Sequence, residues 1–326
     1  MKLWKKSVVL SIALLALGAA RMPYEAGLTR ELLDARLLPS ALEIGTVEKI
    51  GQTSAAVAFG GLRTLIATFL NLRAFTYFTE KRWDDVADTY DTIVDLAPHT
   101  RYYWDSGYWH IAYNAASYYM YDSTLAPVRR KEAWRTSILK GRSFLERGIR
   151  NNPDDWVLHA DLGYLLSDPN KFPAFKDQRE TFSAAADAYQ KAAETGKALG
   201  YVRRFRFYAL ARVEGREAQA LTLARELYAE GTKNRTPTFL SLLLVLEVHE
   251  NPSLDTTARA IELFGTPQKA YSALSGHWQR INERFPIFGI AAAMATLESR
   301  LSIPEKDRVL NQPLPAPRNL EKSFND

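Results

Sequence analysis

The sequence predicts an all-α protein built from successive antiparallel helix pairs. Three segments share a spacing of four and three residues, and two of them add a proline five residues later: Val86/Tyr90/Ile93/Pro98, Gly141/Leu145/Gly148/Pro153 and Ala185/Tyr189/Ala192. In the third segment Gly196 follows in place of the proline. Steps of four and three residues mark one face of a helix, and a proline ends it. Recurrence at intervals of tens of residues is typical of a solenoid of helix pairs.

The first half of the expected array begins after the Gly60-Gly61 pair. Helices are expected over residues 63–81 and 83–96 (pair one) and over 100–121 and 129–150 (pair two). Asp84 and Asp85 suit the positive N-terminal end of the second helix, and Thr100 is a reasonable N-cap for the third. A loop containing Pro127 divides pair two.

Two further pairs complete the array. Helices are expected over 156–166 and 179–195 (pair three) and over 201–214 and 216–230 (pair four). Asp154 and Asp155 should cap and charge the start of pair three, and Gly231 is a natural C-cap for the end of pair four. No stretch alternates as a β-strand would, which leaves an all-helical fold.

The remaining segments flank the array. A short helix is expected over 28–38, and further helices over 239–249, 256–264, 267–284 and 287–301, the first of these buried on all sides. The domain organisation that follows is residues 1–20 as a signal peptide or short anchor, 21–62 as a lead-in, 63–235 as repeats, 236–302 as C-terminal helices packing on the array and 303–326 as a proline-rich tail.

Composition excludes several classes of protein. Of the 326 residues, 47% are hydrophobic and 24% charged, which excludes bulk disorder. The chain has no cysteine, so disulfide frameworks, thiolate metal sites and thiol catalysis are excluded. The net charge is +5, and three of these charges are lysines within the first six residues. The remainder of the chain has a small net charge that is spread evenly, unlike the basic surface of a nucleic-acid-binding protein. We therefore expect no nucleic-acid partner.

The N-terminus has the three-part form of a secretory signal. A short positive segment precedes an apolar or small run over 7–20, with Gly18 and Ala20 placed for cleavage. As a helix this run would reach about 21 Å, less than the roughly 30 Å of a bilayer core. We expect export, with the leader either cleaved or kept as a short membrane anchor. The alternative, an apolar first helix of a cytosolic protein, is opposed by the lysine cluster before the run.

A second apolar window covers residues 54–72. It contains Arg63 and Asn71, and a central arginine costs about 2.5–3.5 kcal/mol on membrane insertion scales. We therefore expect a buried helix of the array here in preference to a membrane span.

The repeated spacing resembles the tetratricopeptide repeat family. That family places a small residue, an aromatic, a small residue and a proline along its second helix, and a large apolar residue followed by Leu-Gly along its first. Trp104 with Gly107, and Leu162-Gly163 with Leu166, fit the first-helix pattern in part. The likeness covers about residues 67–235. It departs from the family in three ways: Val86 and Ile93 stand where small residues are usual, pairs two and three have inserted loops, and pair three lacks the closing proline.

The resemblance implies a right-handed superhelix whose first helices line a concave binding face. The groove-facing residues would then be Asn71, Phe75, Phe78, Tyr102, Asp105, Trp109, Tyr113 and Tyr164. Trp104, Tyr108 and Ile111, on the opposite face, should pack in the core. Trp109 and Tyr113 could instead be buried against the C-terminal helices. Segments 60–74 and 148–166 also look like a group of uncharacterised bacterial proteins with an N-terminal hydrophobic segment and degenerate repeats, which favours a cell-envelope location.

No residue pattern indicates catalysis. The five histidines are too far apart to share a metal site, and no phosphate-binding glycine loop or nucleophile elbow is present. Neither a cofactor nor a metal is expected, and the acidic pairs are interpreted as helix caps.

The favoured function is a non-catalytic scaffold on the periplasmic side of the inner membrane, anchored or released, that binds a protein or peptide with its aromatic concave face. Its membrane association would come from the N-terminus. Two alternatives remain: an enzyme or small-molecule binder with a pocket inside the solenoid, and a subunit of an envelope assembly that uses the convex face and tail.

Overall fold

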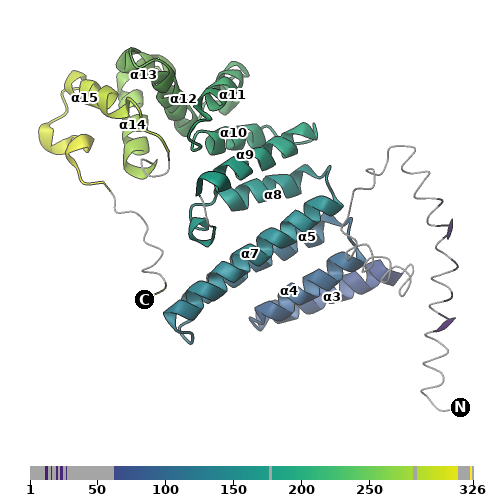
Figure 1. Cartoon of the computed structure of the whole chain (residues 1–326). Helices are drawn as coiled ribbons and strands as arrows, with labels where there is room; N and C mark the ends of the chain where they lie inside the picture. Colours follow the sequence, from purple (N-terminus) through teal and green to yellow (C-terminus); the bar gives the residue numbers. More distant parts are fainter. Residues whose placement is uncertain are drawn as a thin grey trace, which may run out of the picture. The chain divides into compact units, whose positions relative to one another are not determined.

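The computed structural model describes residues 62–314, except 176–177 and 282–284, together with Phe324 and isolated positions among residues 12–27; the side chains of 178–180 and 280–281 lie outside the description. The expected leader, the helix over 28–38 and most of the lead-in also lie outside it. All regular structure in the described part is helical, with no strand, which confirms the predicted all-α class (Figure 1).

The chain divides into two compact units, residues 1–162 with 323–326 and residues 163–322. The first unit contains α3 (Arg63–Thr79), α4 (Trp83–Leu96), α5 (Arg101–Trp109), α6 (Ala116–Tyr121), α7 (Pro127–Asn151) and the first half of α8 (Trp156–Ser167). Within it α3 packs on α4, α4 on α5, and α5 and α6 on α7. The helix pairs expected over 63–96 and 100–150 are therefore present.

A π-helical segment, η2 (His110–Ala115), joins α5 to α6, so that residues 101–121 form one helical stretch, close to the expected 100–121. Within this segment the Asn114 amide lies 2.9 Å from Nδ1 of His110. A π-helical turn rotates the face that follows it and is frequent at functional sites. All three parts of this stretch, α5, η2 and α6, pack on α7.

Glycines set the distance between this stretch and α7. A Cβ atom added to Gly141 would lie 2.6 Å from the Ala112 Cβ and 2.9 Å from the Ala112 backbone nitrogen. At Gly148 it would meet the Trp104 ring at 2.9 Å, and at Gly107 the Phe144 ring at 2.6 Å. Since real Cβ atoms do not approach so closely, the crossing needs glycine at these positions.

Side-chain hydrogen bonds fix the corner between α4 and α5. The carbonyl oxygen of Pro98 accepts hydrogen bonds from Nε1 of Trp104 at 2.7 Å and from Nδ2 of Asn152 at 2.8 Å. The Tyr90 hydroxyl donates to Oδ1 of Asn71 at 3.1 Å and so ties α4 to α3. Together these bonds connect α3, α4, α5 and the end of α7.

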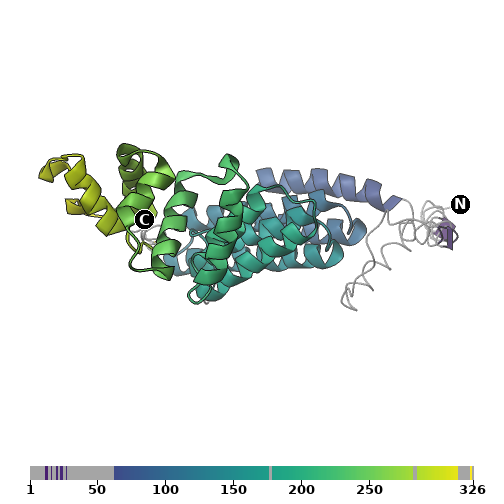
Figure 2. The ribbon, with the colours of Figure 1, turned by 90° about the horizontal axis from the view of Figure 1, so that it is seen from above.

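The second unit is also built of successive helices (Figure 2). It contains α9 (Gln178–Glu194), α10 (Tyr201–Leu210), α11 (Glu217–Ala229), α12 (Pro237–Glu250), α13 (Thr256–Phe264), α14 (Pro267–Ile281) and α15 (Ile290–Arg300). Each helix from α9 to α14 packs on the next, and α15 packs on both α13 and α14. A Cβ atom at Gly163 would lie 2.7 Å from the Tyr189 ring, which repeats the glycine-to-aromatic contact of the first unit. Helix α12 is buried on nearly all sides, as expected.

Three of the helix boundaries that differ from the sequence prediction have a local reason. Helix α7 begins at Pro127, because proline suits the first helical turn. Helix α10 ends at Leu210, before a turn in which Gly215 has φ of 86°. Helix α15 starts after Gly289, where φ is 77°. The described part of the proline-rich tail, residues 303–314, contains 3₁₀ turns at Glu305–Asp307 and Val309–Asn311.

The expectation that the window over 54–72 forms a buried helix is wrong for its described part. Leu65, Phe69 and Leu72 of α3 are 53%, 63% and 61% exposed. Ala67 and Ala74 are buried on the opposite side of α3, where the helix packs. Among the described residues no helix has the length and apolar content needed to span a bilayer.

The glycine crossing predicts that Gly141→Ala destabilises the first unit. Alanine in a helix normally gains about 1 kcal/mol over glycine, but the clash with the Ala112 backbone should cost about 3 kcal/mol, for a net loss near 2 kcal/mol. Urea unfolding followed by tryptophan fluorescence measures the change. Gly200→Ala is the control, because no atom lies within 4 Å of the added Cβ. A Gly141→Ala variant more stable than wild type would contradict the close crossing.

Candidate functional site

The outward face of α5 carries exposed aromatic side chains. Tyr102 is 57% exposed and Trp109 43% exposed, and the partly buried Asp105 lies between them in sequence. Steps of three and four residues place all three on one helix face. Trp104 and Tyr108, on the other face, are each 1% exposed, which confirms their predicted place in the core. Within the first unit Trp109 is therefore an exposed residue, and Tyr113 is partly buried.

Trp109 belongs to a rigid group of rings. Its ring stacks on Tyr113, with centroids 4.3 Å apart and an angle of 14° between the planes. The Tyr108 ring stands nearly perpendicular to both, with its centroid 6.4 Å from that of Trp109 and 6.3 Å from that of Tyr113. Stacked and edge-to-face contacts of this kind hold each ring in place. The exposed part of Trp109 is therefore a preformed flat surface.

Acidic side chains lie beside these rings. Asp161 of α8 accepts a hydrogen bond from the Tyr108 hydroxyl, while its Oδ2 atom is shielded from solvent and accepts none. Burial, together with the nearby Asp105 and Asp155, raises the pKa of Asp161 to about 7. Burial and Asp155 also raise the pKa of Asp105, against the opposing effect of Arg101. The site therefore holds carboxyl groups that a nearby cation would stabilise in their charged form.

Sequence reasoning missed Asp161. It is the only acidic residue in α8, whose sequence WVLHADLGYLLS is otherwise almost entirely apolar. A lone acid in such a helix is the feature that could have indicated it. The neighbouring Asp155 has the predicted capping role, because its Oδ1 accepts a hydrogen bond from the Val157 backbone nitrogen at 3.0 Å.

The predicted groove residues of α3 have different environments. Phe75 is 66% exposed and stacks on Phe78, with ring centroids 6.2 Å apart. Phe78 is partly buried against Trp83 and the His110 ring, and Asn71 accepts the hydrogen bond from Tyr90. Phe75 alone of the three therefore offers a large free surface. Tyr164, 45% exposed, belongs to the second unit.

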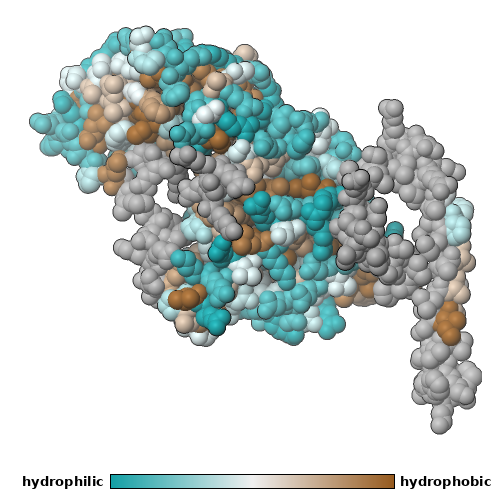
Figure 3. Space-filling view, in the orientation of Figure 1, coloured by the Kyte–Doolittle hydropathy of each residue, from teal (hydrophilic) through white to brown (hydrophobic). Residues whose placement is uncertain are grey.

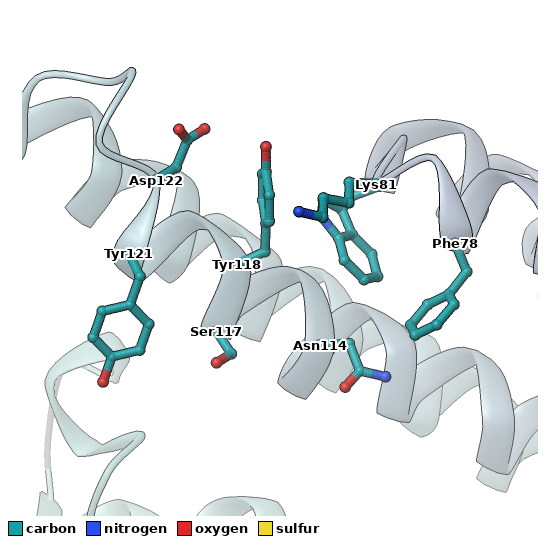
Figure 4. A pocket seen from close by; sticks show the side chains of 8 residues that line it. Phe78, Lys81, Asn114, Ser117, Tyr118, Tyr121 and Asp122 are labelled. Atoms are coloured by element: carbon teal, nitrogen blue, oxygen red, sulfur yellow. The ribbon is translucent and has the colours of Figure 1, made fainter.

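An open pocket of about 470 Å³ lies in the first unit, where the end of α3 meets α6 (Figure 4). Its walls are aromatic and polar: Phe78, Lys81, Trp83, Asn114, Ser117, Tyr118, Tyr121 and Asp122. The Lys81 ammonium lies 5.8 Å from the Tyr118 ring centre, in cation–π range. Burial lowers the pKa of His110, which packs on Phe78 behind this pocket. Because the pocket is open, it would not exclude water from a reaction.

Apolar residues reach the surface in patches between polar areas (Figure 3). Within the part of the chain that the structure describes, no three histidine or acidic side chains are arranged to hold a metal ion. The arrangement of stacked rings, a raised-pKa carboxyl and an exposed tyrosine is suited to binding a cationic, partly apolar group. No family model, curated protein or solved structure matches the chain.

The raised pKa of Asp161 predicts how stability depends on pH. The folded state holds the Asp161 proton up to about pH 7, while the unfolded chain loses it near pH 4, so the wild type loses stability as pH rises between these values. Asp161→Asn should match the wild type at pH 4 and be more stable by about 2 kcal/mol at pH 8, a figure that allows for solvent screening. Urea unfolding at both pH values measures this.

The control is Asp154→Asn, which changes an exposed carboxylate just before the same helix. The difference in unfolding free energy between this variant and the wild type should be the same at pH 4 and at pH 8. A stability difference between Asp161→Asn and wild type that stays constant from pH 4 to pH 8 would show that Asp161 ionises normally.

Proposed function

We propose that this chain is a non-catalytic helical-repeat scaffold of the bacterial cell envelope, which binds a protein segment on the outward face of α5. The fold would be a divergent array of the tetratricopeptide type, and the glycine-to-aromatic crossings of both units support this. The observation that carries the proposal is the exposure of Tyr102 and Trp109 beside the carboxyl groups of Asp105 and Asp161. The N-terminal sequence supports the envelope location.

Large aromatic surfaces favour protein binding for an energetic reason. Tyrosine and tryptophan offer a large contact area and lose little rotamer freedom on binding, and they are enriched among residues that dominate binding energy. The stacking of Trp109 on Tyr113 has already removed most of that freedom. A partner segment would therefore meet a surface that needs little rearrangement.

The carboxyl groups define the chemistry of the partner. A lysine or arginine side chain could place its charge near Asp105 and Asp161 and its aliphatic part on the Trp109 ring, where the cation also gains from the ring electrons. Binding of a cation would lower the pKa of Asp161, so affinity should rise as Asp161 ionises. The partner is accordingly a segment that presents a basic residue beside apolar ones.

Selection from a peptide library tests the proposal. The enriched peptides should contain lysine or arginine next to an apolar residue, and should bind about tenfold more tightly at pH 8 than at pH 6, because Asp161 is mostly ionised only at the higher pH. Fluorescence anisotropy of a selected peptide measures this. Trp109→Ala should weaken binding at least tenfold, and Asp161→Asn should remove the pH dependence.

Tyr201→Ala is the matched control, because it removes an aromatic side chain that is 38% exposed on α10 of the second unit and should leave the affinity unchanged. Enriched peptides without basic residues, or equal losses in Trp109→Ala and Tyr201→Ala, would contradict the proposal.

The second candidate function is an enzyme, and the pKa of Asp161 near 7 favours it, since a general acid or base works best when its pKa lies near the working pH. An enclosed cavity beside the carboxyl group would be needed as well, and the pocket described above is open and lined by other residues. Turnover of a screened substrate that Asp161→Asn abolishes, with peptide binding absent, would favour the enzyme over the scaffold.

A further inference from the structure

The outer face of α3 is an apolar stripe. Leu62, Leu65, Phe69 and Leu72 follow one another at intervals of three, four and three residues, and each is between 45% and 63% exposed. These intervals place the four side chains on one side of the helix. The stripe lies opposite Ala67 and Ala74, which are buried where α3 packs. Helix α3 is therefore apolar on two opposite faces, and among the described elements only the face with Ala67 and Ala74 is packed.

The polar side chains of α3 are compatible with an apolar environment. The Thr68 hydroxyl donates to the Thr64 carbonyl oxygen at 3.0 Å, and the Thr76 hydroxyl donates to the Leu72 carbonyl oxygen at 3.5 Å. Their hydroxyl protons are thus used within the helix, so placing this face in a medium without water leaves no donor unsatisfied. Such bonds are usual for threonine in apolar helices.

The charges of α3 are all positive. Arg63 and Arg73 are its only charged residues, and no acidic residue occurs from Arg63 to Thr79. Arg73 Nε donates to the Tyr77 hydroxyl at 2.7 Å, an exposed bond that holds the guanidinium against the helix. Arg73 follows Leu72 and lies beside the stripe, whereas Arg63 lies four residues before the buried Ala67 and therefore on the packed side of α3. An apolar stripe flanked by an arginine, on a helix without an acidic residue, is complementary to anionic lipid head groups above acyl chains.

We propose that the outer face of α3 lies on an anionic membrane surface, parallel to the bilayer plane. The helix has 17 residues, about 25 Å in length, which suits an interfacial position and not a span. Leu65, Phe69 and Leu72 enter the boundary between head groups and acyl chains, and Arg73 contacts lipid phosphates. This surface is independent of the α5 site, and it adds a second membrane contact to the one expected at residues 1–20.

A second copy of the chain fits the stripe less well. Two α3 helices packed by their outer faces would bring Arg73 of each copy to the contact, and neither helix carries an acid to balance the two charges. Like charges in contact oppose association by several kcal/mol in an interface. Lipid phosphates supply the missing negative charge, whereas a second α3 does not.

Depth-dependent fluorescence in the full chain tests this proposal. Because the chain has no cysteine, single variants Leu65→Cys and Leu72→Cys can be labelled with an environment-sensitive fluorophore. Val128→Cys on α7 is the control, since Val128 is apolar and 78% exposed on a different helix of the same unit. The samples contain vesicles of phosphatidylcholine with one quarter phosphatidylglycerol, with and without lipids that carry a quencher near the head group.

The expected result is a blue shift on addition of vesicles and at least threefold stronger lipid quenching for the α3 labels than for the Val128→Cys label. Equal, weak quenching at all three positions would overturn the proposal, even if residues 1–20 hold the chain on the vesicles. A blue shift already present without lipid would also overturn it, since another part of the chain or a second copy would then cover the stripe.

Arg73 provides the second arm of the experiment. With the Leu72→Cys label in place, Arg73→Gln should reduce the ratio of lipid-contacting to free label about fivefold on the anionic vesicles and leave it unchanged on pure phosphatidylcholine. Equal losses on both kinds of vesicle would show that Arg73 supports the helix and does not contact lipid, which would contradict the charge complementarity.

Discussion

The crossing of α7 with the helical stretch from α5 through η2 to α6 depends on a backbone contact that glycine alone permits. Ala112 approaches Gly141 so closely that a Cβ atom at Gly141 would lie 2.9 Å from its backbone nitrogen, and an aromatic ring covers Gly148 in the same way. Close approach brings the rings of Trp104 and Phe144 to 4.9 Å between centroids. This tight layer holds the stretch in one orientation, and so fixes the outward face of α5.

The site on α5 follows from that orientation. Trp104 and Tyr108 are buried in the core, so the face of α5 that carries Tyr102, Asp105 and Trp109 points outward. The hydroxyl group of the buried Tyr108 donates a hydrogen bond to Asp161. A carboxyl group held by a buried tyrosine and short of a second donor is costly when ionised. A cationic partner would lower this cost. The packing of the core therefore favours partners that carry a positive charge.

Sequence periodicity predicted much of the fold because helix faces repeat at 3.6 residues and prolines and glycines mark their ends. The bounds of α4 and α13 agree with the structure at both ends, and the core role of Trp104 followed from its spacing. The π-helical turn at His110–Ala115 was not predicted, because helical spacing in a sequence does not separate a π-turn from an α-helix; the turn packs on α7. It belongs to the same helical stretch as the α5 site.

The candidate site was predictable only in part, for a physical reason. Residues on one helix share a face by spacing alone, so Tyr102, Asp105 and Trp109 could be grouped from sequence. Asp161 lies 56 residues beyond Asp105, and its pKa depends on burial and on charges from other helices, which no local pattern encodes. Helix α3 shows the converse: its apolar sequence predicted burial, but one of its two apolar faces remains exposed.

Site-specific photo-crosslinking from the α5 face is the most direct test of the central claim. A photoreactive amino acid in place of Tyr102, in the full chain and in its native membranes, should form adducts with one partner segment, and mass spectrometry should place them beside a lysine or arginine. The same group in place of Tyr201 should not mark that segment. Adducts that are absent, scattered over many proteins, or the same from both positions would contradict the account.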